Sequence, residues 1–275
     1  MKRKTLTLEE HQQILYDILY MIDDFCREHN LHYFLVGGSL LGAVRHQGII
    51  PWDDDIDLGM ERSEYERFLL LFRAHTPEGF CLLSIDDTPG YSLPFAKIGK
   101  TGTLQCEVSR NIPSEGIPVN IDILPQDGCP GENKEEAVGY FEQMRASIQG
   151  LIWWRYNEPL SLKQWRRSLR VLRYRMRYRT IESVKQVYAI ATRHQVKECK
   201  FYACFVNGIY GKGEVQPASS ILGELPRLPF GTRTIPVPKM WHEYLSGLYG
   251  DYMTPPPPEK RKRHSNDGNS YLIQE

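Results

Sequence analysis

The feature that most constrains this chain is a glycine turn followed closely by a run of aspartates. The apolar residues 33–36 predict a short buried strand, Gly37-Gly38-Ser39 interrupts it, and a helix-like run follows over residues 40–45. A strand that ends in glycines and opens a helix leaves backbone N–H groups free at the helix start, where a phosphate binds well. Gly38 lets the backbone approach a ligand closely, and the Ser39 hydroxyl can donate one more hydrogen bond. Because such turns are also common where no phosphate binds, this pattern alone leaves both interpretations open.

The aspartates at residues 53–57 alternate as side chains of a strand do. Asp55 and Asp57 share one face, while the apolar residues beside them point into the core. Two neighbouring carboxylates repel each other unless a cation lies between them, and Mg²⁺ prefers such oxygen ligands. Asp53 has the same parity and is a further candidate ligand, whereas Asp54 is expected to be solvated or to cap a turn. The alternative is a solvated acidic turn without a metal.

A third candidate carboxylate lies in the apolar stretch over residues 116–125. Val119, Ile121 and Ile123 alternate with other positions, which predicts a strand from which Asp122 projects. A lone carboxylate among apolar neighbours is unfavourable unless it is paired or bound to a ligand. Asp122 is therefore a candidate for a functional site, with an aspartate that caps a strand end as the alternative.

Helix and strand signals alternate over the first half of the chain. Thr7-x-x-Glu10 and Ser63-x-x-Glu66 are capping-box patterns, which predict one helix that runs to about residue 30 and another over residues 63–74. Lys97 lies inside a predicted strand, where an isolated lysine is typically a solvated edge residue. Arg45 and His46 close the helix after the glycine turn, where the helix dipole favours cations. The predicted strands here cover residues 80–84, 93–98 and 101–106.

The second half of the chain is predicted to be mainly helical. Helices are expected over residues 135–151, 181–196, 200–210 and 239–248, with one strand over 232–237. The expected fold class is α+β, with a mixed sheet and flanking helices over residues 1–130. A mostly helical portion follows over residues 131–264, and residues 265–275 are expected to form a flexible tail.

One segment of the second half is strongly basic. Residues 161–179 contain eight Lys and Arg residues and no acid. Trp165 and Leu169 belong to an apolar stripe at helical spacing, and arginines line the adjacent face. Such a helix could lie on an anionic membrane surface, or it could pack its stripe on the catalytic domain and leave the arginines facing solvent or an anionic substrate. The sequence does not decide between these interpretations.

Composition excludes several other classes of protein. The 275-residue chain has 41% hydrophobic residues and a formal net charge of zero, so no overall field favours nucleic acid. Its six cysteines have no zinc-site spacing and are expected to be reduced thiols. No secretory leader is expected at the start of the sequence, and the sequence contains no run of eighteen apolar residues. The expected location is cytoplasmic, with peripheral contact at the inner face of the plasma membrane if the basic helix binds lipid.

The wider string over residues 38–46 and 50–57, Gly-Ser-Leu-Leu-Gly-Ala-Val-Arg-His and Ile-Pro-Trp-Asp-Asp-Asp-Ile-Asp, resembles the LicD family. This family includes bacterial phosphocholine transferases and is related to fukutin and fukutin-related protein. The resemblance implies a nucleotidyltransferase-like fold in which Asp55 and Asp57 hold one or two Mg²⁺ ions, with Mn²⁺ as an alternative. It also implies that Asp122 supplies the third catalytic carboxylate from a separate strand, as a further metal ligand and as general base.

The resemblance extends to several phosphate and substrate contacts. With Gly38 and Ser39, the family pattern makes Arg45, His46 and Lys97 candidate contacts to nucleotide or substrate phosphate. Residues 249–252, the four prolines at 255–258 and the basic cluster after them resemble the closing motif of the family. This similarity places Arg261 and His264 at the rim of the expected active site.

By the same resemblance, the chain is expected to be a phosphotransferase. The expected donor is a CDP-alcohol, most often CDP-choline, and the expected acceptor is a sugar hydroxyl of a cell-surface polysaccharide, lipopolysaccharide or teichoic-acid precursor, lipid-linked or free. CMP would be released. Two alternatives stay open at this point: transfer of the nucleotide itself from a nucleoside triphosphate to a small acceptor, and a non-enzymatic nucleotide-binding scaffold.

Overall fold

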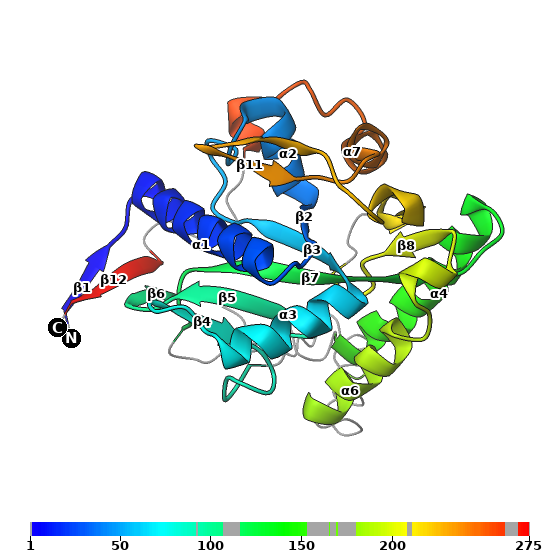
Figure 1. The fold of residues 1–275 in the computed structure, drawn as a ribbon, viewed down its shortest axis with the longest axis horizontal. Helices are drawn as coiled ribbons and strands as arrows, with labels where there is room; N and C mark the ends of the chain where they lie inside the picture. The colour runs from blue at the N-terminus through cyan, green and yellow to red at the C-terminus, as the bar shows by residue number, and fades with distance from the viewer. Residues whose placement is uncertain are drawn as a thin grey trace.

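The computed structural model describes residues 2–91, 93–106, 116–152, 165, 169, 180–207, 211–261 and 269–274. It has an α+β architecture in which helices pack around a mixed sheet (Figure 1). Helix α1 (Leu8–Glu28) begins at the predicted capping box, where the Thr7 hydroxyl accepts from the Glu10 N–H and the Glu10 carboxylate accepts from the Thr7 N–H. The expected α+β class is confirmed at this level.

The central sheet places the longest strand, β7 (Asn120–Cys129), between β3 (Asp57–Glu61) and β5 (Ala96–Lys100). β3 runs parallel to β7, and the other pairs in this sheet are antiparallel. The register sets Asp57 beside Asp122 on one side of β7 and Lys97 beside Asp122 on the other. The outer strands are β2 (Phe34–Leu35) next to β3 and β4 (Phe80–Leu83) next to β5.

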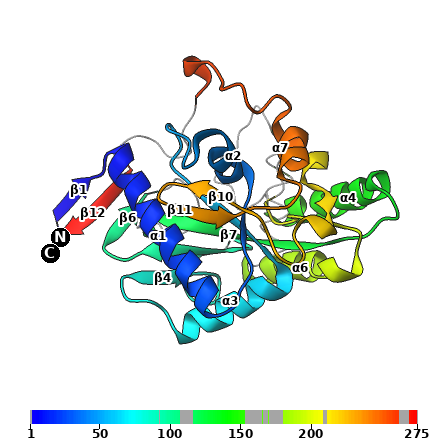
Figure 2. The same ribbon diagram turned by 45° about the horizontal axis from the view of Figure 1, so that its top comes forward.

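Helices α1 and α3 (Arg62–Ala74) lie together on the sheet and share an aromatic contact. The Phe25 ring of α1 packs 5.7 Å from that of Phe68 and 5.1 Å from that of Phe72, centroid to centroid. On another side of the molecule, α2 (Gly37–His46) and α7 (Trp241–Tyr249) contact each other near the hairpin β10–β11 (Figure 2). The hairpin strands are Arg227–Phe230 and Arg233–Pro236, and α4 (Lys134–Ile152) packs against α6 (Thr180–Ala191).

Three local predictions are wrong, and each fails for a tertiary reason. The helix predicted over residues 200–210 is absent from the described residues 200–207, because Phe201–Ala203 pairs as β8 with the far end of β7 and with β9 (Gln216–Pro217). Helix α3 has no side-chain cap at Ser63; it starts at Arg62, which points inward to a buried ion pair with Asp127.

The third error is the flexible tail over residues 265–275. Ser270–Gln274 forms β12, which lies between β1 (Lys2–Thr5) and β6 (Thr103–Gln105) in a separate three-stranded sheet. The pairing joins the start of the chain to its last described residues, as Figure 1 shows. Backbone hydrogen bonds on both edges order this segment, and no local sequence signal reports such partners.

The basic segment over residues 161–179 lies outside the described residues except for two positions. Trp165 and Leu169 are helical and 56% and 55% exposed. Among the described helices, none combines the length and apolarity that crossing a bilayer requires.

Candidate active site

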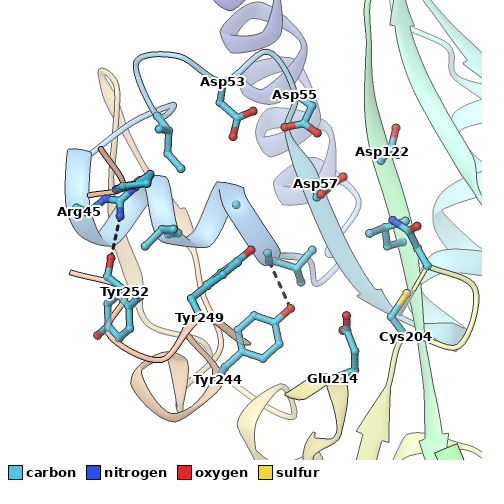
Figure 3. Close-up of a pocket in the computed structure, with 18 of the residues that line it drawn as sticks. Arg45, Asp53, Asp55, Asp57, Asp122, Cys204, Glu214, Tyr244, Tyr249 and Tyr252 are labelled. Atoms are coloured by element: carbon cyan, nitrogen blue, oxygen red, sulfur yellow. Dashed lines mark hydrogen bonds between the residues drawn. The ribbon is translucent and has the colours of Figure 1, made fainter. Parts of the chain in front are cut away.

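A cavity of about 710 Å³ opens where β3, β7, α2 and α7 meet (Figure 3). Asp53, Asp55 and Asp57 lie along one wall, and Asp122 projects from the neighbouring strand. The alternation predicted from sequence holds, because Ile56 is buried while the aspartates on either side of it reach the cavity. The regular strand begins only at Asp57, so Asp53 and Asp55 belong to the loop that enters it.

Side chains of helix α1 fix this acidic loop by contacting the backbone carbonyl oxygens of the loop. Gln12 Nε2 donates to the carbonyl oxygens of Asp53 at 2.7 Å and Ile50 at 3.3 Å. His11 Nε2 lies 3.0 Å from the carbonyl oxygen of Asp54. The prediction that Asp54 is solvated is wrong: the residue is 5% exposed, because the loop turns it against α1. The carboxylates that face the cavity are therefore held on an anchored loop.

The first turn of α2 faces the acidic cluster. The helix starts at Gly37, earlier than predicted, so the glycines form its first turn rather than a preceding loop. Gly37 has a φ of +53°, and a Cβ there would lie 3.7 Å from Asp57 Oδ2. A Cβ on Gly38 would lie 3.4 Å from Asp53 Oδ2. The absence of side chains thus keeps a gap between the helix start and the carboxylates, where the positive end of the helix dipole favours an anion.

Two hydrogen bonds join the first turn of α2 to the elements around it. The Gly37 N–H donates to the Tyr244 hydroxyl at 3.3 Å. Ser39 is buried and is not among the cavity-lining residues; its Oγ accepts from the Asp57 N–H at 2.8 Å. Ser39 therefore joins α2 to the first residue of β3, which differs from the phosphate contact expected of it.

Asp122 is held by Lys97 across two paired strands. Lys97 Nζ and Asp122 Oδ1 are 2.5 Å apart, and Lys97 is only 7% exposed. The interpretation of Lys97 as a solvated edge residue is wrong, because β5 lies inside the sheet between β4 and β7. Lys97 is also not among the cavity-lining residues, so it contributes its charge from behind Asp122.

Burial and mutual repulsion set the electrostatics of the cluster. Burial, together with the charge of Asp122 and against the charge of Lys97, raises the pKa of Asp57 to about 8. Burial, followed by the charges of Asp57 and Asp53, raises the pKa of Asp55 well above its usual value. The folded chain thus favours protonated carboxyls here, and a bound cation would favour the ionised forms instead.

The opposite end of the cavity is cationic and aromatic. Arg45 and Trp52 line it, and Arg45 Nη1 donates to the carbonyl oxygen of Tyr252 at 2.8 Å. The Arg261 guanidinium lies 4.3 Å from the centre of the Trp52 ring. Burial, and then the charges of Arg45 and Arg261, lower the pKa of His46. Arg45 thus faces the cavity directly, with Arg261 and His46 behind its lining; His264 lies outside the described residues.

Several cavity residues were not predicted as site residues. Cys204 and Asn207 come from residues 200–210, where the mispredicted helix hid their position, and Glu214 follows that stretch without a sequence signal of its own. Tyr244 comes from α7 and carried no sequence signal of its own. Tyr249, Asp251 and Tyr252 also line the cavity, and the closing motif at residues 249–252 was the signal that could have identified them.

The donor chemistry of the cluster fits a hard divalent cation. In the part of the chain that the structure describes, no three His, Cys, Asp or Glu side chains stand ready as a complete metal-ligand set. Mg²⁺ does not require such a set, since it is often held by one or two carboxylates and completed by water and substrate phosphates. Asp55 and Asp57, whose pKa values are raised by burial and then by neighbouring carboxylates, are the residues that fit this description.

Comparison with known proteins agrees with the sequence resemblance. Residues 30–92 match the family model described as LicD/FKTN/FKRP, nucleotidyltransferase domain. This segment is therefore similar to the LicD family. The LicD segment contains α2, the acidic loop and β3, and it ends before Asp122 and Glu214.

Two relatives show how far the LicD similarity extends. Over 270 residues the chain is 29% identical to the lipopolysaccharide cholinephosphotransferase LicD of Haemophilus influenzae, an alignment that covers 95% of this chain and 97% of that protein. Over 30 residues it is 67% identical to ribitol 5-phosphate transferase FKRP of Homo sapiens, covering 11% of this chain and 6% of that protein. The similarity to LicD therefore spans both walls of the cavity.

Proposed function

We propose that this protein transfers a phospho-alcohol, phosphocholine in the first instance, from a CDP-alcohol to a glycan hydroxyl and releases CMP. The observation that carries the proposal is the acidic cluster beside the first turn of α2, because one cavity then offers carboxylates for a cation and the positive end of a helix for a phosphate. A diphosphate donor needs both. The names of the two relatives, a cholinephosphotransferase and a ribitol 5-phosphate transferase, support the reaction class.

In this proposal the protein adopts a nucleotidyltransferase-like arrangement, and each wall of the cavity has a separate task. Asp55 and Asp57 would hold Mg²⁺ or Mn²⁺, whose charge would neutralise the diphosphate and the leaving phosphate. Gly37 and Gly38 let the diphosphate approach the start of α2. Arg45 attracts the anionic donor at the other end of the cavity. Lys97 orients Asp122 through their ion pair.

The acceptor is proposed to be a sugar of a lipopolysaccharide or related surface glycan. The side of the cavity formed by β7 and the segment after β8 offers Gln126 and Asn207 as hydrogen-bonding side chains. Amide side chains both donate and accept, which suits sugar hydroxyls. Teichoic-acid precursors belong to the same class of acceptor and can be tested beside lipopolysaccharide.

The test follows both halves of the donor. The protein is incubated with Mg²⁺, an oligosaccharide acceptor and a panel of CDP-choline, CDP-ethanolamine, CDP-ribitol and CTP. Chromatography measures CMP, and ³¹P NMR identifies the phosphorus that reaches the acceptor. Release of CMP with a phosphodiester on the glycan is the expected result. Transfer of the nucleotide from CTP, or turnover that EDTA does not affect, would contradict the proposal. Asp17→Asn, an exposed carboxylate of α1, is the matched control for Asp55→Asn.

A further inference from the structure

Glu214 is a cavity carboxylate from outside the acidic cluster. It ends a short 3₁₀ helix (Gly211–Glu214), is 7% exposed, and lines the same cavity as Asp57. Figure 3 shows its carboxylate directed into the cavity between Tyr244 and Cys204. Unlike the aspartates, it belongs to the C-terminal half of the chain.

The backbone around Glu214 is tightly fixed. A Cβ on Gly213 would lie 2.7 Å from the carbonyl oxygen of Gly247, so the 3₁₀ helix packs directly on the backbone of α7. Gln216 Nε2 donates to the carbonyl oxygen of Gly213 at 2.8 Å. These contacts fix the backbone that carries Glu214, and a fixed backbone helps to position a group that must meet a reacting hydroxyl.

The charge of Glu214 also acts on two residues of the proposed donor site, Tyr244 beside the start of α2 and Asp57 in the acidic cluster. After burial, its charge is the largest contribution that raises the pKa of Tyr244, the residue bonded to the Gly37 N–H. It also contributes to the raised pKa of Asp57. The charge of Glu214 also raises the pKa of Tyr202 and Cys204, so these two residues, Tyr244 and Asp57 are titratable neighbours of Glu214.

The remaining cavity carboxylates have other partners or tasks. Asp122 Oδ1 is 2.5 Å from Lys97 Nζ, so one of its two carboxylate oxygens is already paired with a cation. Asp55 and Asp57 are the proposed cation ligands, and Asp53 lies beside them. Asp251 is exposed and accepts from Thr254 Oγ1 at 2.7 Å. Glu214 is the buried alternative on the side where Asn207 and Gln126 offer contacts to a sugar.

We propose that Glu214, rather than Asp122, is the general base that deprotonates the acceptor hydroxyl. The Glu214 carboxylate takes the hydroxyl proton as the acceptor oxygen bonds to the phosphorus of the phospho-alcohol. The bond from that phosphorus to the oxygen bridging it to CMP breaks, and CMP leaves with the electron pair. Solvent then removes the proton from Glu214. This assignment rests on the proposed function and names the residue that would activate its acceptor.

The test compares Glu214→Gln with Glu224→Gln, an exposed control, and with Asp122→Asn. Glu214→Gln is expected to lower kcat by about 10²-fold or more while the donor KM and Mg²⁺-dependent CDP-choline binding stay near wild type. Formate is expected to restore part of the transfer by Glu214→Ala, because it can replace the missing carboxylate. Retained nucleotide binding also shows that these variants are folded.

Three outcomes would overturn the assignment. A wild-type kcat in Glu214→Gln would show that no proton passes through this residue. Loss of Mg²⁺-dependent donor binding would make Glu214 part of the donor site instead. If formate fails to restore transfer by Glu214→Ala but restores transfer by Asp122→Ala, the role of general base returns to Asp122. If the wild-type protein transfers no phospho-alcohol from any donor, the proposed function itself fails, which the parallel wild-type assay reports separately.

Discussion

Replacing Asp57 by Asn is expected to stabilise the metal-free protein. The pKa of Asp57 lies at about 8 in the fold against an ordinary value of 3.8, so the folded chain binds a proton that the unfolded chain releases. The stability contributed by this group is therefore greatest below about pH 4 and is lost as pH rises towards 8. At pH 7 the cost has an upper bound of about 4 kcal/mol, at about 1.4 kcal/mol per pH unit.

Asparagine removes that cost because it has nearly the same shape and no charge to bury. Asp57 borders an open cavity, and its charge is coupled to the charges of Asp55 and Asp122. We therefore expect Asp57→Asn to raise the free energy of unfolding by about half of the upper bound, about 2 kcal/mol. For a chain of this length that corresponds to a rise in Tm of about 4 °C. The gap between variant and wild type should widen from pH 5 to pH 8.

Thermal unfolding in EDTA, followed by circular dichroism at several pH values, measures this gap directly. Mg²⁺ is then added: it should raise the Tm of the wild type, more at pH 8 than at pH 6, and leave Asp57→Asn nearly unchanged. Asp17→Asn, on the exposed face of α1, controls for the substitution and should stay within about 0.5 kcal/mol of wild type. A variant that melts at or below the wild-type temperature at pH 8 in EDTA would refute the reasoning.

Two further predictions concern packing that supports the site. Arg62→Ala should lower the free energy of unfolding by about 3–5 kcal/mol in urea titrations, because it leaves the fully buried Asp127 carboxylate unpaired. The exposed Arg73→Ala should cost less than about 1 kcal/mol, and equal losses would contradict this explanation. Gly42→Ala should cost about 1–3 kcal/mol by the same assay, because its Cβ would lie 2.4 Å from a backbone carbonyl oxygen in the loop that follows α2. Gly139→Ala, with open space around it in an exposed part of α4, should instead stabilise by about 0.5–1 kcal/mol; a loss there would count against the reasoning.

Local rules predicted the parts of the fold whose partners are near in sequence. The Thr7 capping box formed because both of its halves lie within one helical turn. The similar pattern at Ser63 did not, because Arg62 is drawn inward by Asp127 from a distant strand. Residues 200–210 have a composition that either helix or strand accommodates, and the exposed edge of β7 decided the outcome.

The same distinction holds in the candidate site. The glycine turn and the aspartate alternation are local, so sequence could predict that Asp55 and Asp57 face one side. The pairing of Lys97 with Asp122 depends on the register of β5 against β7, which no local pattern specifies. Glu214 is still further from prediction, because its position depends on the contact between a 3₁₀ helix and α7.

The insertion of β12 between β1 and β6 has a practical consequence for handling this protein. Ser270–Gln274 is the middle strand of its sheet, so deleting it would strip hydrogen-bonding partners from two strands at once. Exposed strand edges pair readily with other chains. Removing Ser270–Gln274 as a presumed tail would therefore expose the edges of β1 and β6 that β12 now covers, and these edges could pair with other chains and promote aggregation.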